Sequence, residues 1–560
     1  MRLLTAAIFG LTVITLAACG GGGSGGGSSV TQQPPQNVSP PPAPPAPPSA
    51  PLNQVTVSGQ VSFDRVPLNE ASGLDYASTL RLPIRSAVVE AVSETGAVIA
   101  STVSNADGRY ELSLDAQTDV RLQVKAQLLS TSGAMWDFFV TDNTQGNRLY
   151  AMQGSLASTG NRSEQIRDLH AGHGWTGESY GEARTAAPFA ILDSVYNAAQ
   201  AFVQIDNNIE FPPLEIHWSV DNITAVGDRS LGHIGKSAYF PDEGDGVIYI
   251  LGQEDADTDE YDQHVIIHEW GHYFEDRLSR TDSIGGLHSL NDRLDARVAF
   301  SEGWGNGLSA IITGDPVYRD SSGRAQSSGF SFDLETVSLD HPGWFSEASV
   351  GAIIYDIFDN NSDDGDNISA GLAPIYNVMR SDAYQSSPLF ATIFAFADGL
   401  RVEGTIPNRE IDSLLAGHAI SGVGPNGNGE VNNGAIGSAL PVYNEVILDG
   451  GAVQFCSTDE AGVFNRLGNR DFTFLNLPQE TDVKISVEKI SGLEGRDPDF
   501  NIWQAGQLIH RAQRTAENED SFEGTLEAGA YIIEAYDFFN IGGVGVQRGD
   551  SCYELRVEGN

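Results

Sequence analysis

Two histidines and a glutamate lie close together in the run His268-Glu269-Trp270-Gly271-His272, and their spacing suits metal chemistry. Positions i and i+4 of a helix share one face, so His268 and His272 can both present imidazole nitrogens to one metal ion. Glu269, one position further around, can then reach a water molecule bound to that ion. Apolar residues on both sides of the run and the absence of proline favour a helix. The pattern therefore predicts a hydrolytic site with a metal, a glutamate base and an attacking water.

A third ligand is available 30 positions after His272. Glu302 stands among small and aromatic residues in the stretch 300–310, which we also expect to be helical. Two histidines and one glutamate leave the fourth position of a tetrahedral zinc site open for water, as catalytic zinc requires. We therefore predict one Zn²⁺ per chain, held by His268, His272 and Glu302, with Glu269 as general base.

These two segments together resemble a known family. His-Glu-x-x-His followed by Glu-Gly-Trp at 302–304 is similar to the gluzincin zinc metallopeptidases, most of all to their fungalysin and thermolysin-type branch. The resemblance implies zinc ligands at His268, His272 and Glu302, and a catalytic glutamate at Glu269. The Gly-x-Met-Glu-Asn run of gluzincin aminopeptidases is missing from this sequence. We therefore expect an endopeptidase that hydrolyses peptide bonds with a zinc-activated water.

One departure from the family pattern stands at Asn306, four residues after the third ligand. The family usually has aspartate there, where it orients the first histidine. Asparagine can accept the same hydrogen bond but brings no charge, so we expect a weaker or less basic zinc site. Spacing does not place the residue that stabilises the transition state. His341 and Tyr355 are candidates, although a loop histidine and a core tyrosine are the simpler interpretations.

The elements around the motif follow the same resemblance, which covers about residues 190 to 425 of the chain. We expect two short strands at 236–240 and 247–250, separated by an acidic turn. They are similar to the edge strand on which gluzincins bind an extended peptide through backbone hydrogen bonds. A helix is expected from Ser346 to Phe358.

The N-terminal segment predicts export and lipid attachment. The apolar run 8–16 is too short to span a membrane and is typical of a signal peptide over residues 1–19. Leu-Ala-Ala-Cys at its end resembles the lipobox of bacterial lipoproteins, which implies cleavage before Cys19 and a lipid on its sulfur. Gly20, rather than aspartate, follows this cysteine, which by resemblance to the sorting of Gram-negative lipoproteins favours the outer membrane. We expect a lipid-anchored protein of the bacterial cell envelope, at the outer membrane or the cell surface.

The other two cysteines, Cys456 and Cys552, remain in a chain that we expect to be exported. A disulfide between them is the natural assignment in an oxidising compartment, and two free thiols are the alternative.

The length predicts several domains in a multidomain α+β fold. Residues 20–52 are rich first in glycine and serine and then in proline, so we expect a tether without a core. A connecting region at 131–189 leads to a zincin-like metallopeptidase domain at 190–440, with an edge-stranded sheet and active-site helices.

Two stretches flank this domain in which apolar and polar residues alternate, as is typical of β-strands. Residues 53–130 resemble the carboxypeptidase regulatory-like β-sandwich, with the turn of a hairpin at Asp107-Gly108. Residues 441–560 resemble the C-terminal β-sandwich that follows many secreted bacterial peptidases. Both are expected to be accessory domains.

The excess of acidic over basic residues bears on the kinds of molecule that the protein can bind. The chain has 75 Asp and Glu against 31 Lys and Arg, a net charge of −44. Such a surface argues against nucleic acid and anionic membrane surfaces as partners. The resemblance to peptidases implies a peptide or protein substrate. Oxygen-rich stretches at 254–262 and 359–366 do not fit an EF-hand loop, and solvated loops are the simpler interpretation. Calcium is therefore an option without an assigned site, and the sequence does not indicate an oligomeric state.

The alternative to an enzyme is a binding protein. The chain would then be a surface lipoprotein for adhesion or for binding glycans or proteins, and its peptidase scaffold would be degenerate. The intact Glu269 favours the enzyme, because a site without catalysis has no need of that carboxylate.

Overall fold

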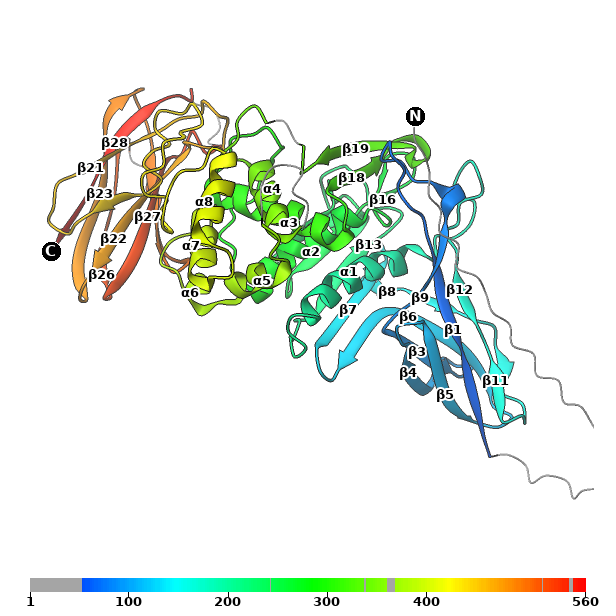
Figure 1. Cartoon of the computed structure of the whole chain (residues 1–560). Helices are drawn as coiled ribbons and strands as arrows, with labels where there is room; N and C mark the ends of the chain where they lie inside the picture. The colour runs from blue at the N-terminus through cyan, green and yellow to red at the C-terminus, as the bar shows by residue number, and fades with distance from the viewer. Residues whose placement is uncertain are drawn as a thin grey trace, which may run out of the picture. The chain divides into compact units, whose positions relative to one another are not determined.

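The computed structural model describes residues 53–559 except 242, 337–338, 360–367, 516 and 543–546. Cys19, the expected signal peptide and the expected tether lie outside these residues, as does most of the oxygen-rich stretch at 359–366. The described chain is mostly β with some helices (Figure 1). None of the described helices is long and apolar enough to cross a membrane.

A mixed sheet with the strand order β14-β15-β13-β7-β6-β3-β4 runs through the first half of the described chain. Its strands are β3 (Ala87–Val92), β4 (Val98–Val103), β6 (Asp119–Thr131), β7 (Met135–Asp142), β13 (Leu214–Trp218), β14 (Ala238–Phe240) and β15 (Val247–Ile250). Every second residue of β6 is buried from Val120 to Leu128, as expected for a strand with one face on a core. The expected strands at 236–240 and 247–250 are β14 and β15, and β14 is the edge of this order.

The sheet continues across the boundaries expected after residues 130 and 189. Strand β7 pairs antiparallel with β6 on one side and parallel with β13 on the other. No break in the sheet therefore separates the strands before residue 130 from strands β13, β14 and β15. Alternating apolar residues predict a strand and its buried face, but they do not say which strand will pair with it.

The turn at Asp107-Gly108 does not close a hairpin, contrary to expectation. It joins β4 to β5 (Arg109–Asp115), yet β4 pairs with β3 whereas β5 pairs with β1 (Gln54–Arg65). The turn carries the chain from one sheet to another, because local turn chemistry fixes a reversal and not the partner strand.

Helices pack against the mixed sheet and also come after it in the sequence. Helix α1 (Ala187–Val203) contacts β6 and β7 (Figure 1), and it begins a group with α2 (Gln263–Leu278), α3 (Ala296–Thr313) and α4 (Glu347–Phe358). Helix α3 contacts both α2 and α4. The expected helix at 346–358 is α4, for which Ser346 is the N-cap. Among the residues that the structure describes, four further helices follow: α5 (Leu372–Arg380), α6 (Asp382–Gln385), α7 (Ile393–Glu403) and α8 (Asn408–Gly417).

A small sheet lies in the order β16-β17-β18-β19. Its strands are β16 (Gly252–Gln253), β17 (Asp257–Thr258), β18 (Val317–Ser322) and β19 (Ser328–Asp333). It joins the segment just before α2 to the hairpin that follows α3.

The C-terminal part contains two sheets, β20-β22-β27-β24-β25 and β21-β28-β23-β26. The strands are β20 (Asn444–Val446), β21 (Val453–Ser457), β22 (Arg470–Leu477), β23 (Thr481–Gly492), β24 (Pro498–Gln504), β25 (Gln507–Ala512), β26 (Glu519–Leu526), β27 (Gly529–Asp537) and β28 (Ser551–Gly559). Apolar residues of both sheets, such as Ile485 and Ile533, are fully buried in one core. The expected disulfide between Cys456 and Cys552 is present and links β21 to β28.

Candidate metal centre and active site

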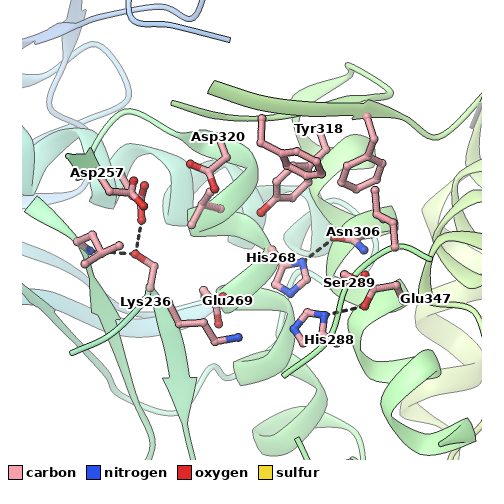
Figure 2. A pocket seen from close by; sticks show the side chains of 17 residues that line it. Lys236, Asp257, His268, Glu269, His288, Ser289, Asn306, Tyr318, Asp320 and Glu347 are labelled. Carbon is pink, nitrogen blue, oxygen red and sulfur yellow. Dashed lines mark hydrogen bonds and ion pairs between the residues drawn. The ribbon is translucent and has the colours of Figure 1, made fainter. Parts of the chain in front are cut away.

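The His-Glu-x-x-His run lies in the middle of α2, as its sequence predicts. His268 and Glu269 are buried, and His272 is partly buried. His268 and Glu269 line a cavity of about 300 Å³ that Lys236, Asn306 and other side chains also line (Figure 2). The histidines are one turn apart, so their rings project from the same face of the helix.

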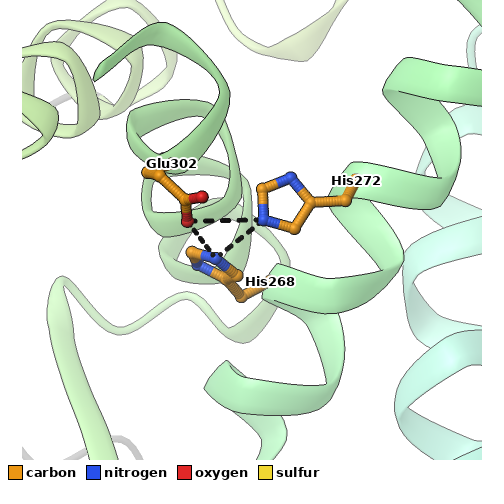
Figure 3. Close-up of side chains that lie close together, drawn as sticks. All are labelled: His268, His272 and Glu302. Carbon is orange, nitrogen blue, oxygen red and sulfur yellow. Dashed lines mark hydrogen bonds and ion pairs between the residues drawn. The ribbon is translucent and has the colours of Figure 1, made fainter. Parts of the chain in front are cut away.

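Glu302 reaches the two histidines from α3. Its Oε2 lies 3.2 Å from Nε2 of His268 and 3.5 Å from Nε2 of His272, and the two Nε2 atoms are 3.1 Å apart (Figure 3). Ligands at about 2.0–2.1 Å from a tetrahedral zinc ion lie about 3.3 Å from each other. The three atoms therefore have the spacing of three corners of a zinc tetrahedron, and the donor set of two imidazoles and one carboxylate suits zinc.

Glycines explain how the helices come close enough. A Cβ atom on Gly305 would lie 2.7 Å from Nδ1 of His268. On the other side of α3, a Cβ atom on Gly303 would lie 2.5 Å from Cβ of Val350 in α4. Both approaches are too short for any larger residue. The glycines that follow Glu302 at every second position thus allow α3 to fit between α2 and α4.

Hydrogen bonds on the far side of each ring orient the histidines. Nδ1 of His268 lies 3.0 Å from Oδ1 of Asn306, which can only accept, so this nitrogen carries the proton. Nδ1 of His272 lies 3.2 Å from Oγ of Ser301, and that hydroxyl donates to Glu275 at 2.6 Å. Both Nε2 atoms therefore face Glu302 and are the atoms that would bind a metal ion, which would displace a proton from Nε2 of His272.

The charges of the three groups are coupled. Burial opposes ionisation of both Glu302 and His272, but their mutual attraction outweighs it. It holds the pKa of Glu302 well below its usual value and that of His272 well above it. The carboxylate of Glu302 is thus stabilised as an anion, which is the form that binds a metal ion.

Glu269 points to the other side of the cavity, toward the edge strand. Its Oε2 accepts a hydrogen bond of 2.7 Å from the backbone N–H of Tyr239 in β14. The side chain is 8 % exposed. A peptide chain that paired with β14 would therefore pass directly beside this carboxylate.

His288 belongs to the site, although the motif analysis missed it. It lies between α2 and α3, lines the cavity, and places Nε2 3.2 Å from Oε2 of Glu302. Its Nδ1 lies 2.7 Å from Oε2 of Glu347 in α4. No fixed spacing connects it to the motif, and Glu347 is 59 positions away. The one available signal is that His288 is the sole histidine of the sequence between His272 and Glu302.

The two residues considered as stabilisers of the transition state, His341 and Tyr355, lie away from the cavity. His341 is exposed and Tyr355 is buried in α4, and neither is among the described residues that line the cavity. His288 and Tyr318 do line it. These positions fit the simpler interpretations of His341 as a loop histidine and Tyr355 as a core tyrosine.

Comparisons with known proteins agree with part of this picture. Residues 235–395, which include α2 and α3 but are less than half of the chain, match the mycolysin C-terminal domain family. A search of curated proteins returns no match.

Three solved structures share limited similarity with the chain. The protealysin precursor of Serratia proteamaculans is 11% identical with a TM-score of 0.30, over 53% of this chain and 89% of its own. The pre-peptidase C-terminal domain of collagenase from Bacillus anthracis is 16% identical with a TM-score of 0.16, over 20% of this chain and 93% of its own. The lysozyme inhibitor PliG of Aeromonas hydrophila is 14% identical with a TM-score of 0.15, over 21% and 97%. The family match at 235–395 points to a peptidase-related protein.

Proposed function

We propose that this chain is a zinc metalloendopeptidase of the gluzincin, thermolysin-like type. One observation carries the proposal: His268, His272 and Glu302 bring three ligand atoms to within 3.1–3.5 Å of one another. The carboxylate of Glu269 on the same helix supports it, as does the family match over the segment that holds all four residues.

The zinc ion, when bound, would lower the pKa of a water molecule and polarise the peptide carbonyl. Glu269 takes the proton of the attacking water and passes it to the leaving amine. The hydrogen bond from the N–H of Tyr239 fixes the orientation of this carboxylate between the edge strand and the ligands. Burial keeps competing water away from the base.

The substrate is proposed to be an extended peptide that pairs with β14. The strand is the edge of its sheet, so in the described chain one side of its backbone is not paired with another strand. His288, oriented by Glu347, is the candidate that stabilises the negative charge on the carbonyl oxygen during attack. It replaces His341 and Tyr355 in this role.

Cell-envelope location is part of the proposal. The lipobox-like sequence before Cys19 supports lipid attachment, and the residues after it supply a tether between a membrane and the folded chain. Substrates would then be peptides or proteins outside the cytoplasm.

Metal analysis of the purified full-length protein tests the proposal. We expect about one zinc per chain and digestion of an unfolded protein such as casein. Glu302→Ala removes one of three ligands and should lose both the zinc and the activity. Glu111→Ala, which removes an exposed carboxylate on β5, is the control and should change neither. Full zinc content in the Glu302→Ala protein would contradict the ligand assignment.

A further inference from the structure

Another cavity lies at the N-terminal end of helix α2. Its volume of about 590 Å³ is within the range of about 300–1,000 Å³ that is usual for small-molecule sites. Gln263 and His264 of the first turn of α2 line it, whereas Val265, His268 and Glu269 line the catalytic cavity. Within the described chain, the two cavities have no lining residue in common.

Strand β18 forms part of both cavities. Its Tyr318 and Asp320 line the catalytic cavity, and Arg319, between them in the sequence, lines the other one. Successive side chains of a strand point to opposite faces, which explains this division. The other walls include residues of the segments 65–68 and 80–85 and part of α1. The second cavity is thus built from the N-terminal strands and from elements next to the candidate metal centre.

Positive charge exceeds negative charge in this cavity, although the chain as a whole has a net charge of −44. The lining contains three arginines and two aspartates, which leaves one positive charge in excess: Arg65, Arg85, Arg319, Asp193 and Asp315. The sign of the charge is therefore opposite to that of the rest of the protein. A cavity of this kind favours an anionic ligand.

Arg65 and Arg85 share one carboxylate. Nη2 of Arg65 lies 3.2 Å from Oδ2 of Asp193, and Nη2 of Arg85 donates to Oδ1 of the same side chain. Arg65 is 5 % exposed, yet its Nη1 has no hydrogen-bond partner in the described chain. Arg85 donates through Nε and Nη2, which leaves its Nη1 without a described partner. One carboxylate thus compensates two guanidinium groups, and a second anion would complete the pairing.

Further donors line the same cavity. Arg319 donates through Nη1 to Asp315 and to the carbonyl of Val317, so its Nη2 has no partner among the described residues. Tyr261 is 1 % exposed, and its hydroxyl also has no partner there. Burial lowers the pKa of His264 to about 4, so this histidine adds no charge at pH 7. Arginine can only donate, so these groups favour a ligand with acceptor atoms.

We propose that this cavity binds a carboxylate that carries an apolar body. Guanidinium groups bind carboxylates and phosphates through paired N–H donors, and one excess positive charge matches a carboxylate better than a doubly charged phosphate. Apolar side chains form much of the remaining wall: Val66, Pro67, Leu68, Leu80, Leu82 and Pro83. Leu80 is 54 % exposed, so a ligand that covers it removes apolar surface from water.

Two sources supply this chemistry: a fatty acid, or the C-terminus of a peptide that ends in an apolar residue. Either ligand would contact Gln263 and His264, at the start of the helix that carries the candidate zinc ligands. The inference does not rest on the proposed peptidase activity, because the catalytic residues do not line this cavity.

Isothermal titration calorimetry of the full-length protein tests the inference. Sodium octanoate and N-acetyl-leucine represent the two sources, and octanol and N-acetyl-leucinamide are their neutral analogues. We expect one molecule of acid to bind per chain, at least about tenfold more tightly than its neutral analogue, because the analogue lacks the charge-assisted hydrogen bonds. Binding of only one acid would identify the source, and binding of both would support the shared chemistry.

Two variants locate the site. Arg319→Gln removes a cation from the cavity and should weaken binding of the acid at least about tenfold. Arg324→Gln, at an exposed arginine between the strands of the same hairpin, is the matched control and should bind as the wild type does. Leu80→Asp adds a negative charge at an exposed position of the wall and should also weaken binding. Leu231→Asp, at an exposed leucine outside the cavity, is its control.

His272→Ala, which removes a proposed zinc ligand, should bind the acid as the wild type does. Failure of the zinc proposal and failure of this one are therefore distinguishable. A wild type that binds neither acid, or that binds the acids and their neutral analogues equally, would overturn the inference. Unchanged affinity in both Arg319→Gln and Leu80→Asp, or equal weakening by Arg324→Gln, would also overturn it.

Discussion

Nδ1 of His268 lies 3.0 Å from Oδ1 of Asn306, so an amide orients the first histidine of α2 where a carboxylate would add charge. The bond fixes the proton on Nδ1 and leaves Nε2 to face Glu302. Replacing Asn306 by Leu should lower zinc affinity about 10–100-fold, as is typical when a partner of a ligating histidine is lost. Asn306→Asp should raise zinc affinity because it adds a negative charge beside the ring.

Competition with a zinc chelator measures both effects. Asn377→Leu on the exposed face of α5 is the matched control and should leave zinc affinity unchanged. If the Leu and Asp variants bind zinc as the wild type does, Asn306 does not act on the metal centre.

Cys19→Ala should release the protein from the membrane fraction or block its processing. The lipid on this cysteine is the proposed anchor, so its loss should remove the membrane attachment that we propose. Fractionation of cells that produce the two proteins checks this, with Cys456→Ala as a control that removes a different cysteine. Unchanged membrane association of the Cys19→Ala protein would reject the lipid anchor.

Asp499 of β24 should make stability depend on pH. The residue is 4 % exposed, and burial together with Asp497, Asp520 and Asp537 raises its pKa to about 8 from 3.8. The folded state therefore holds a proton that the unfolded state releases between about pH 4 and 8, and stability falls as pH rises through this window. Asparagine cannot ionise, so Asp499→Asn should be more resistant to urea than the wild type at pH 9 and similar to it at pH 4.

Urea unfolding midpoints across this range test the effect. Asp482→Asn, at an exposed position of β23, serves as the control for removal of one negative charge. If the unfolding midpoints of the wild type and Asp499→Asn change with pH in parallel, the raised pKa of Asp499 is contradicted.

Local patterns predicted the elements that carry the candidate centre. The apolar flanks of His268 and the small residues around Glu302 indicate the helices that the structure contains as α2 and α3. The strands β14 and β15, the helix α4 and the disulfide between Cys456 and Cys552 were also predicted. These features depend on residues that are near in sequence, or on the scarcity of cysteine.

Features that depend on distant partners were not predictable in this way. His288 gains its place through Glu347, and Asp257 meets Asp320 only because β17 pairs with β18. The stretch 254–262 was interpreted as a solvated loop, yet Asp259 and Asp262 are buried. The continuation of the sheet from β6 through β7 to β13 was missed for the same reason, because strand pairing is a tertiary property.

Peptide hydrolysis by Glu269→Gln tests the central claim most directly. Glutamine retains the shape of the side chain and can still accept the hydrogen bond from Tyr239, but it cannot take a proton from water. We predict that zinc content stays near one per chain while the rate of casein or peptide hydrolysis falls at least about 100-fold. Equal rates for the two proteins, or a zinc-replete wild type that cleaves no unfolded protein or peptide library, would contradict the account.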